Sequence, residues 1–301
     1  MLFAGQLEEP WKRHAIDPAH PRVQSLRLHD VNRDGRADLI ATLPESREIR
    51  VYTHPPYVRV RAATAWPHVS ISAICAAEDA YFVDLDHDGA IDILSACPEP
   101  RPTALFVQWG PKWKAQPIPA PSPIVQWALA IPFRFNHDGR TRVVAAGKLE
   151  YAELTLFSPG ANPRDLTQWT GKLLDVPGWT MSLIPVDMDG DGEEDLLMSD
   201  RKGSKSGVFW LEAPNWQRHT IGAANEEVMF VEEADMDGDG LNDIAAAIHP
   251  GAVVWFRRLD ASGLNWKRFS LPYPPGAGTA TAVSTGDLNR DGRVDLSLIH
   301  I

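Results

Sequence analysis

A nine-residue, Asp-rich pattern recurs along this chain at a nearly constant interval. Five intact copies read "DVNRDGRAD" from Asp30, "DLDHDGAID" from Asp84, "DMDGDGEED" from Asp187, "DMDGDGLND" from Asp235 and "DLNRDGRVD" from Asp287. A damaged copy, "RFNHDGRTR", begins at Arg134, and successive copies start between 48 and 54 residues apart. A period of this length over a whole chain indicates a repeat architecture, in which each repeat is one supersecondary unit.

Each repeat contains segments that are typical of four strands. One apolar run leads into the Asp-rich stretch, as "SLIPV" does from Ser182, and another, such as "DLLMS", leads out of it. A run of aromatic and β-branched residues follows, and a segment that usually begins with Trp ends the repeat. The aromatic runs begin at Ile49, Leu105, Leu154, Val208 and Val253, and the last segments at Tyr57, Trp113, Trp169, Trp216 and Trp266. Four antiparallel strands in about 50 residues are typical of one blade of a β-propeller.

The two ends of the chain are expected to complete each other. The last repeat ends after its second strand, and the missing strands are present at the start as "LFAG" from Leu2 and "WKRHAI" from Trp11. We therefore predict an all-β fold in a single domain over residues 1–301, a six-bladed β-propeller with four antiparallel strands per blade. Pairing of the N-terminal strands with the C-terminal blade closes the ring and leaves no open edge, so that residues 1–16 and about 279–301 share the sixth blade.

The Asp-rich stretches have the composition of calcium-binding loops. Asp or Asn at the first, third and fifth positions places oxygen ligands on one side of a tight turn, and Gly at the sixth position permits the sharp reversal. Without a cation these carboxylates would repel one another and raise one another's pKa. An EF-hand is excluded because it requires Glu at position twelve, where the intact copies have Ala41, Ser95, Met198, Ala246 and Leu298.

An Asp loop of this kind between two strands resembles the FG-GAP/VCBS repeat of integrin α-subunit heads and many secreted bacterial proteins. The segments "WKRHAI" and "WQRHTI" also resemble a strand of VCBS repeats, so the resemblance spans essentially the whole chain. It implies a Ca²⁺-stabilised propeller but no single activity, since the family serves adhesion, glycan binding and a few enzymes. By match to the motif, the expected side-chain ligands are Asp30, Asn32, Asp34, Asp38, Asp84, Asp86, Asp88, Asp92, Asp187, Asp189, Asp191, Asp195, Asp235, Asp237, Asp239, Asp243, Asp287, Asn289, Asp291 and Asp295. The expected carbonyl ligands, from position seven, are Arg36, Ala90, Glu193, Leu241 and Arg293.

The damaged copy departs from this pattern. Arg134 and Arg142 stand at its first and ninth positions, where the other copies have Asp. We expect no metal ion in the loop from Arg134 to Arg142, and we expect one of the two guanidinium groups to pair with Asp138 in place of the cation. The alternative is a decayed loop with both Arg side chains in solvent.

The formal net charge of −11 argues against a nucleic-acid partner, because phosphate binding requires a basic surface. The five intact loops contain 18 Asp, and taking away their charges leaves +7, so the acidity belongs mainly to the loops. No apolar run is long enough to cross a bilayer, and "MLFAGQLEEP" shows no signal-peptide pattern. We expect a monomer without membrane insertion, secreted or periplasmic because such loops fill at extracellular calcium concentrations.

Two cysteines are present, Cys75 and Cys97. They either form a disulfide or remain buried thiols, and their apolar neighbours favour thiols.

Ligand-contacting residues are expected at the mouth of the central channel, where loops before the first strands and after the second strands meet. Trp127, Trp179, Arg201 and Glu226 are predicted to bind a ligand there, and His249, His300 and Lys148 are the candidates for a catalytic base. No GxSxG, HExxH, P-loop or GxGxxG motif is present. Their absence does not exclude an enzyme, because propeller active sites assemble from different blades. We predict a non-catalytic binding module for a carbohydrate or a protein partner.

Two other functions stay open. One is a carbohydrate-active enzyme of the polysaccharide lyase or sugar dehydratase type, with a site built from several loops. The other is an integrin-like interaction head, in which a ligand carboxylate would meet an exposed ion.

Overall fold

The computed structural model describes residues 14–19, 22–57, 59–60, 64–72, 75–98, 104–119, 122, 124–271 and 278–300. These residues form six antiparallel sheets, each built from consecutive strands. The first sheet contains β1 Ser25–His29, β2 Asp38–Leu43, β3 Glu48–Tyr52 and β4 His68–Ser72. The second contains β5 Asp79–Val83, β6 Asp92–Cys97, β7 Ala104–Trp109 and β8 Lys114–Ile118. The third contains β9 Gln126–Arg134, β10 Thr141–Lys148, β11 Leu154–Ser158 and β12 Thr170–Asp175.

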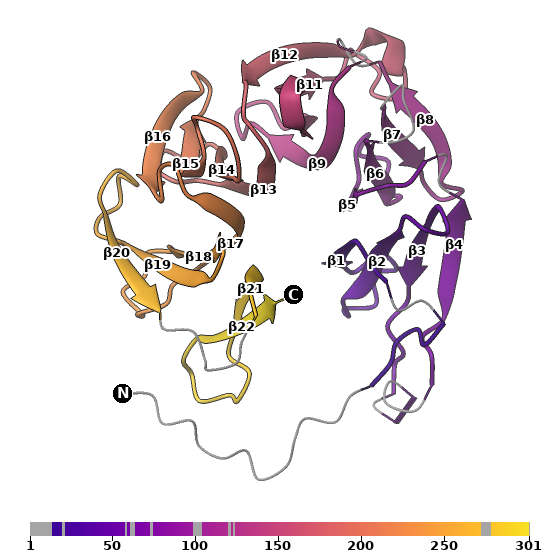
Figure 1. Ribbon diagram of the computed structural model, residues 1–301. Coiled ribbons are helices and arrows are strands. Elements are labelled where there is room, and N and C mark those ends of the chain that lie inside the picture. The colour runs from indigo at the N-terminus through magenta and orange to yellow at the C-terminus, as the bar shows by residue number, and fades with distance from the viewer. Residues whose placement is uncertain are drawn as a thin grey trace.

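The remaining sheets follow the same order. The fourth contains β13 Thr180–Val186, β14 Asp195–Asp200, β15 Gly207–Glu212 and β16 Gln217–Gly222. The fifth contains β17 Glu227–Ala234, β18 Asp243–His249, β19 Ala252–Arg258 and β20 Trp266–Leu271. The sixth has two strands, β21 Ala280–Gly286 and β22 Asp295–His300. Figure 1 shows the sheets following one another around a common centre, with the first strand of each sheet innermost.

The all-β prediction is confirmed, but the prediction of one six-bladed propeller closed by the N-terminal strands is wrong. The six sheets are separate, none is closed into a ring, and β21 and β22 have no third strand among the described residues. The end of the segment expected to join them lies against the first sheet instead, where the Ile16 carbonyl accepts the Trp66 amide at 2.9 Å. Asp17 likewise accepts hydrogen bonds from Arg50 and Tyr52. "LFAG" and residues 11–13 lie outside the described residues, and the single domain over 1–301 stays a prediction.

The repeat pattern otherwise predicts the strand positions that the structure shows, but the start of one strand is wrong. The fourth strand of the first sheet was expected to begin at Tyr57, but β4 begins at His68, and Tyr57 is exposed. Pro55 and Pro56 precede Tyr57, and two successive prolines remove two amide donors, which disfavours the start of a paired strand there. The chain therefore runs through a longer loop before His68 pairs with Tyr52.

Apolar side chains pack between successive sheets rather than in one central core. One cluster joins the second and third sheets through Leu94, Trp127 and Phe157, and another joins the fourth and fifth through Leu197, Trp210 and Phe256. The second strands β2, β6 and β14 are buried along their whole length. Each sheet is thus stabilised mainly by burial against its neighbours.

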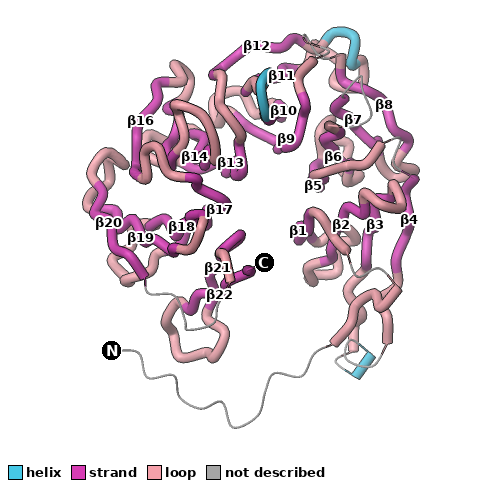
Figure 2. The backbone as a smooth tube through the Cα atoms, viewed as in Figure 1, coloured by secondary structure: helices cyan, strands magenta, loops and turns pink. Residues whose placement is uncertain are grey.

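In the part of the chain that the structure describes, helix is confined to short pieces in loops (Figure 2), including the 3₁₀ turns η1 Leu149–Tyr151 and η2 Leu166–Gln168. Within the described ranges no helix has the length and apolar character needed to cross a membrane.

Cys75 and Cys97 form a disulfide, so the expectation of free thiols is wrong. Cys75 lies just before β5 and Cys97 ends β6, with Cα atoms 5.9 Å apart. Both lie in the cluster that joins the first and second sheets. Their apolar surroundings are as expected, but the pairing of β5 with β6 brings the two residues together, which spacing alone does not reveal.

Candidate metal loops and ligand-binding surface

Every Asp loop connects the first strand of a sheet to the second. We number the loops by their sheets, so the damaged copy is the third loop. The intact loops share one register, in which the residue before position one pairs with the Asp at position nine, as in Val83 with Asp92 and Val186 with Asp195. The Gly at position six has a positive φ in each, for example +88° at Gly89. Side chains other than Gly rarely adopt this conformation, which explains its recurrence at this position.

The Asp at position nine holds the ends of two strands together. In the second loop, Asp92 accepts the amide of Leu85 at 3.0 Å and the amide of Gly110, after β7, at 2.7 Å. Asp195 binds Met188 and Ala213 in the same way. These carboxylates are buried, and burial raises the pKa of both Asp92 and Asp195 to about 6 despite the two amide donors.

Three loops gather carboxylates closely enough to surround one cation. The oxygen atoms lie within 4.8 Å of one another in three sets: Asp84, Asp86 and Asp92; Asp187, Asp189 and Asp195; and Asp235, Asp237 and Asp239. In the first set, one buried oxygen of Asp84 has no hydrogen-bond partner among the described residues. An unsatisfied buried carboxylate oxygen among other carboxylates fits a hard divalent cation, because Ca²⁺ takes six to eight oxygen ligands.

The other expected ligands are arranged less tightly. Asp88, Asp191 and Asp243 are not in the three sets. Nor do the described carboxylates of the first and last loops form such a set, and there Asn32 and Asn289 occupy position three. At position seven the amide donates to the Asp at position five, as in Ala90 to Asp88 at 2.8 Å. Coordination by the position-seven carbonyls stays a prediction.

The damaged loop is held by arginine, as expected. Arg142 forms a two-pronged ion pair with Asp138 and lies over the ring of Phe135, 4.6 Å from its centroid. This pair lowers the pKa of the Asp138 carboxyl. The prediction that one guanidinium pairs with Asp138 is therefore confirmed, whereas the absence of a metal ion from this loop stays a prediction.

Acidic residues of the fourth loop bind the damaged loop from the neighbouring sheet. Glu194 accepts the Arg134 amide at 2.8 Å, and Glu193 accepts the Asn136 amide at 2.7 Å. Glu193 also lies 2.9 Å from His137 Nδ1. Among the intact copies, only the one from Asp187 has Glu at positions seven and eight. It lies beside the damaged loop, which lacks Asp at its ends.

The strand ends opposite the Asp loops carry a second cluster, which we call the Trp179 surface: Lys148, Trp179, Arg201, Lys202, Glu227 and His249. Three cationic groups lie near the Trp179 ring, with Lys148 Nζ, Arg201 Cζ and Lys202 Nζ at 5.8, 5.3 and 5.4 Å from its centroid. Glu227 joins this group to the fifth sheet, because its Oε2 lies 3.2 Å from Arg201 Nε and 3.4 Å from His249 Nδ1. Lys148 is also paired with Glu78, from the loop before β5.

A buried carboxylate positions Trp179. Asp200, at the end of β14, accepts the amides of Gly178 and Trp179 at 2.7 Å each. Gly178 is needed at this close approach, since a Cβ atom there would lie 1.6 Å from the Lys202 carbonyl oxygen. The Asp200 carboxylate thus fixes the backbone that carries the half-buried indole.

The predicted ligand-binding and catalytic residues are only partly brought together. Lys148, Trp179, Arg201 and His249 meet on the Trp179 surface. Trp127 is fully buried against Phe157, so it has no surface for a ligand. Glu226 is paired with Arg268 of β20 rather than with Arg201, and the side chain of His300 lies outside the described residues.

Sequence reasoning missed Glu227, Lys202 and Asp200. Glu227 is adjacent to the predicted Glu226, and the alternation of side chains in a strand that begins at residue 227 is the only signal that separates them. Asp200 and Lys202 flank Arg201 in the segment "SDRKGSK" from Ser199, of which only Arg201 is among the predicted ligand-binding residues.

The fold and these loops define an all-β repeat protein with Asp loops at its first hairpins. Residues 235–297 match the model of the FG-GAP-like repeat. No curated protein matches this chain. Among solved structures, the V. cholerae biofilm matrix protein Bap1 is similar at 17% identity and a TM-score of 0.50. The alignment covers 91% of this chain and 43% of Bap1, so this chain spans less than half of that structure, and the likeness concerns the fold alone.

Proposed function

We propose that this chain is an extracellular binding module, with Ca²⁺ held in its Asp loops and a ligand bound at the Trp179 surface. The ligand class that suits this surface best is a carbohydrate with carboxylate groups. The alternative of a protein partner would use the same residues through acidic side chains.

The observation that carries the binding role is the convergence of Lys148, Arg201 and Lys202 on one half-buried indole. An aromatic face stacks on the apolar face of a sugar ring, and cations within a few Å bind its carboxylates. These groups come from the third and fourth sheets, and Glu78 and Glu227 tie them to the second and fifth. A ligand there would contact several repeats at once.

Three features support an extracellular location. The Cys75–Cys97 disulfide is typical of oxidising compartments. Asp loops of this type suit the calcium concentrations outside cells. The similar fold of Bap1 belongs to a biofilm matrix protein, which is consistent with a role in adhesion.

Calcium, when bound, would supply the positive charge that the clustered carboxylates need in order to remain ionised while buried. Asp84, Asp86 and Asp92 would hold one ion. Two others would be held by Asp187, Asp189 and Asp195 and by Asp235, Asp237 and Asp239. The remaining intact loops would each hold an ion with the help of Asn32 or Asn289.

A polysaccharide lyase or sugar dehydratase needs a base that is free to take a proton. On the Trp179 surface Lys148 is paired with Glu78, and His249 lies beside Glu227. Lys148 is thus engaged with a carboxylate, whereas His249 contacts Glu227 through Nδ1 only, and the side chain of the third candidate, His300, lies outside the described residues. The assay for turnover described below therefore decides between binding and catalysis.

The proposal is tested by titrating the protein with tetragalacturonate in calcium buffer and measuring heat, alongside an ultraviolet assay for unsaturated products. We expect saturable binding without product, and Arg201→Ala should weaken it about tenfold, as expected for loss of a charge-assisted hydrogen bond. Arg268→Ala is the matched control, because Arg268 also pairs with a Glu but belongs to β20, the fourth strand of its sheet, and the cations found near the Trp179 ring are Lys148, Arg201 and Lys202. Equal affinity in the wild type and Arg201→Ala would contradict the site, and product formation would favour the enzyme.

A further inference from the structure

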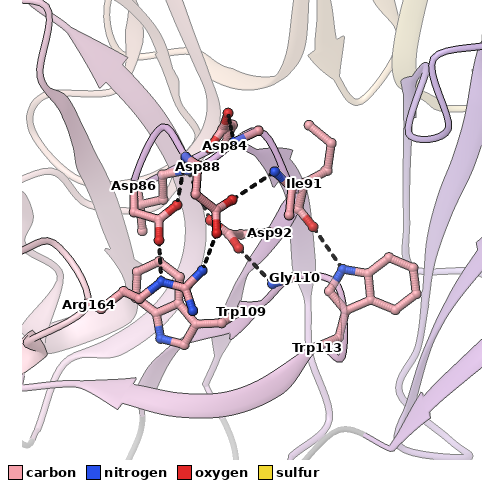
Figure 3. Close-up of polar contacts among 12 residues, drawn as sticks. Asp84, Asp86, Asp88, Ile91, Asp92, Trp109, Gly110, Trp113 and Arg164 are labelled. Atoms are coloured by element: carbon pink, nitrogen blue, oxygen red, sulfur yellow. Dashed lines mark hydrogen bonds and ion pairs between the residues drawn. The ribbon is translucent and has the colours of Figure 1, made fainter.

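Two Asp loops hold a guanidinium group in the same place. In the second loop, Arg164 Nε is paired with Asp86 and its Nη2 lies 2.6 Å from Asp88 (Figure 3). In the fifth loop, Arg257 Nε lies 2.5 Å from Asp237 and its Nη2 3.2 Å from Asp239. In each case the arginine bridges the carboxylates at positions three and five, which are expected metal ligands.

The two arginines reach this position from different elements. Arg164 comes from the loop between β11 and β12 of the neighbouring third sheet and lies over the Trp109 ring, 5.1 Å from its centroid. Arg257 belongs to β19, in the same sheet as its loop. Because they do not share a repeat position, the common geometry is not a by-product of the repeated sequence.

The fourth loop lacks such a bridge. Asp187, Asp189 and Asp191 accept hydrogen bonds from the amides of their own loop, such as Asp187 from Gly190 at 2.8 Å. Within the described part of the chain no Arg or Lys is paired with these three carboxylates. The second and fifth loops therefore differ from the fourth in this contact, while in the first loop Arg36 pairs with Asp34, at 3.1 Å.

We propose that Arg164 and Arg257 are built-in competitors of Ca²⁺, which make the second and fifth loops bind the ion more weakly than the fourth. The inference rests on the proposed calcium role and extends it to a graded response. A Ca²⁺ ion would bind the same carboxylate groups, which the arginines contact through Oδ2, so the guanidinium must either leave or remain within a few Å of a divalent cation. In the ion-free loop the same arginine offsets carboxylate repulsion, so it stabilises the state that calcium replaces.

Arg164 also connects the second sheet to the third through the second loop. While it is paired with Asp86 and Asp88, the loop between β11 and β12 is attached to the second sheet. Where calcium displaces Arg164 this attachment is released, whereas in the fifth loop Arg257 acts within one sheet.

The test is isothermal titration of the full chain with CaCl₂, comparing the wild type with Arg164→Gln, Arg257→Gln and Arg268→Gln. The wild type should show a tighter and a weaker phase. Each of the first two variants should move one ion from the weaker phase to about tenfold tighter binding. Arg268→Gln is the control and should leave the isotherm unchanged, because Arg268 pairs with Glu226 outside the loops.

Thermal unfolding gives a second readout for the same variants. Arg164→Gln and Arg257→Gln should each lower the Tm in EDTA while increasing the Tm gain on adding CaCl₂. Unchanged isotherms and Tm gains in both variants would overturn the competition while leaving the calcium role intact. Absence of calcium heat and of a Tm gain in the wild type would overturn the calcium role itself. If Arg164→Gln does not fold, Arg257→Gln alone decides the matter.

Discussion

The Asp at position nine has a different task from the other Asp residues of its loop. Asp195 is buried and accepts two backbone amides that have no other acceptor in the loop, those of Met188 and Ala213. Asp191, by contrast, is exposed and accepts only from its own turn. Asp195 therefore stabilises the hairpin by its hydrogen bonds, whereas the main expected role of Asp191 is to bind the cation.

This difference predicts unequal effects of mutation. Asp195→Ala should lower the free energy of unfolding by about 2 kcal/mol or more in both calcium and EDTA, because two buried amides lose their acceptor. Asp191→Ala should be destabilising in calcium and neutral or stabilising in EDTA, because removing it relieves repulsion. Urea titration in the two buffers measures both effects. Equal losses for both variants in EDTA would refute the distinction.

The Arg142–Asp138 pair should stabilise the damaged loop without calcium. The pKa of Asp138 is lowered in the folded state, chiefly by its hydrogen bond with Arg142, so the pair contributes fully above the carboxyl's ordinary pKa of 3.8. This contribution is lost as the pH falls through the lower folded value. Asp138→Asn should therefore destabilise the protein equally at pH 7 and pH 5, with or without EDTA, and less near pH 2. Urea titration at these pH values provides the measurement, and a calcium-dependent penalty would contradict a metal-free loop.

At the scale of single strands and loops, the sequence predicted much of what the structure contains. The apolar runs around each Asp loop, the aromatic third strands and the pairing of Asp138 are all local patterns, and local patterns can be read directly. The contact of Arg164 with the second loop and the contact of Glu227 with Arg201 could not be predicted from the sequence. Each joins different sheets through side chains that have no periodic spacing. The closure of the chain ends was misjudged for the same reason: Ile16 and Asp17 find partners in the first sheet.

The disulfide links the segment before β5 to the end of β6 in the second sheet. Cys75 and Cys97 are 22 residues apart, and a loop of that size is expected to contribute about 3 kcal/mol by restricting the unfolded chain. The Cys75→Ser, Cys97→Ser double variant should therefore unfold at a lower urea concentration than the wild type. Adding a reductant should lower the wild-type midpoint towards that of the variant. A wild type insensitive to reductant at its midpoint would contradict this contribution.

At the scale of the whole molecule, the Asp loops and the Trp179 surface lie at opposite ends of the strands. The Asp loops lie at the first hairpins, and the Trp179 surface lies where the first strands begin and the second strands end. Because each sheet buries its apolar faces against the next, an ion that fixes one hairpin also fixes the docking of its neighbours. Calcium should thus support the Trp179 surface indirectly, by holding the sheets that carry its residues.

Thermal unfolding of the wild type in calcium and in EDTA tests this account most directly. With an ion in each intact loop and CaCl₂ well above its dissociation constants, the Tm should rise by at least about 5 °C over the value in EDTA. Magnesium at the same concentration should give a smaller rise, since it binds all-protein cages poorly. The same Tm in calcium and in EDTA would show that the Asp loops do not hold structural calcium.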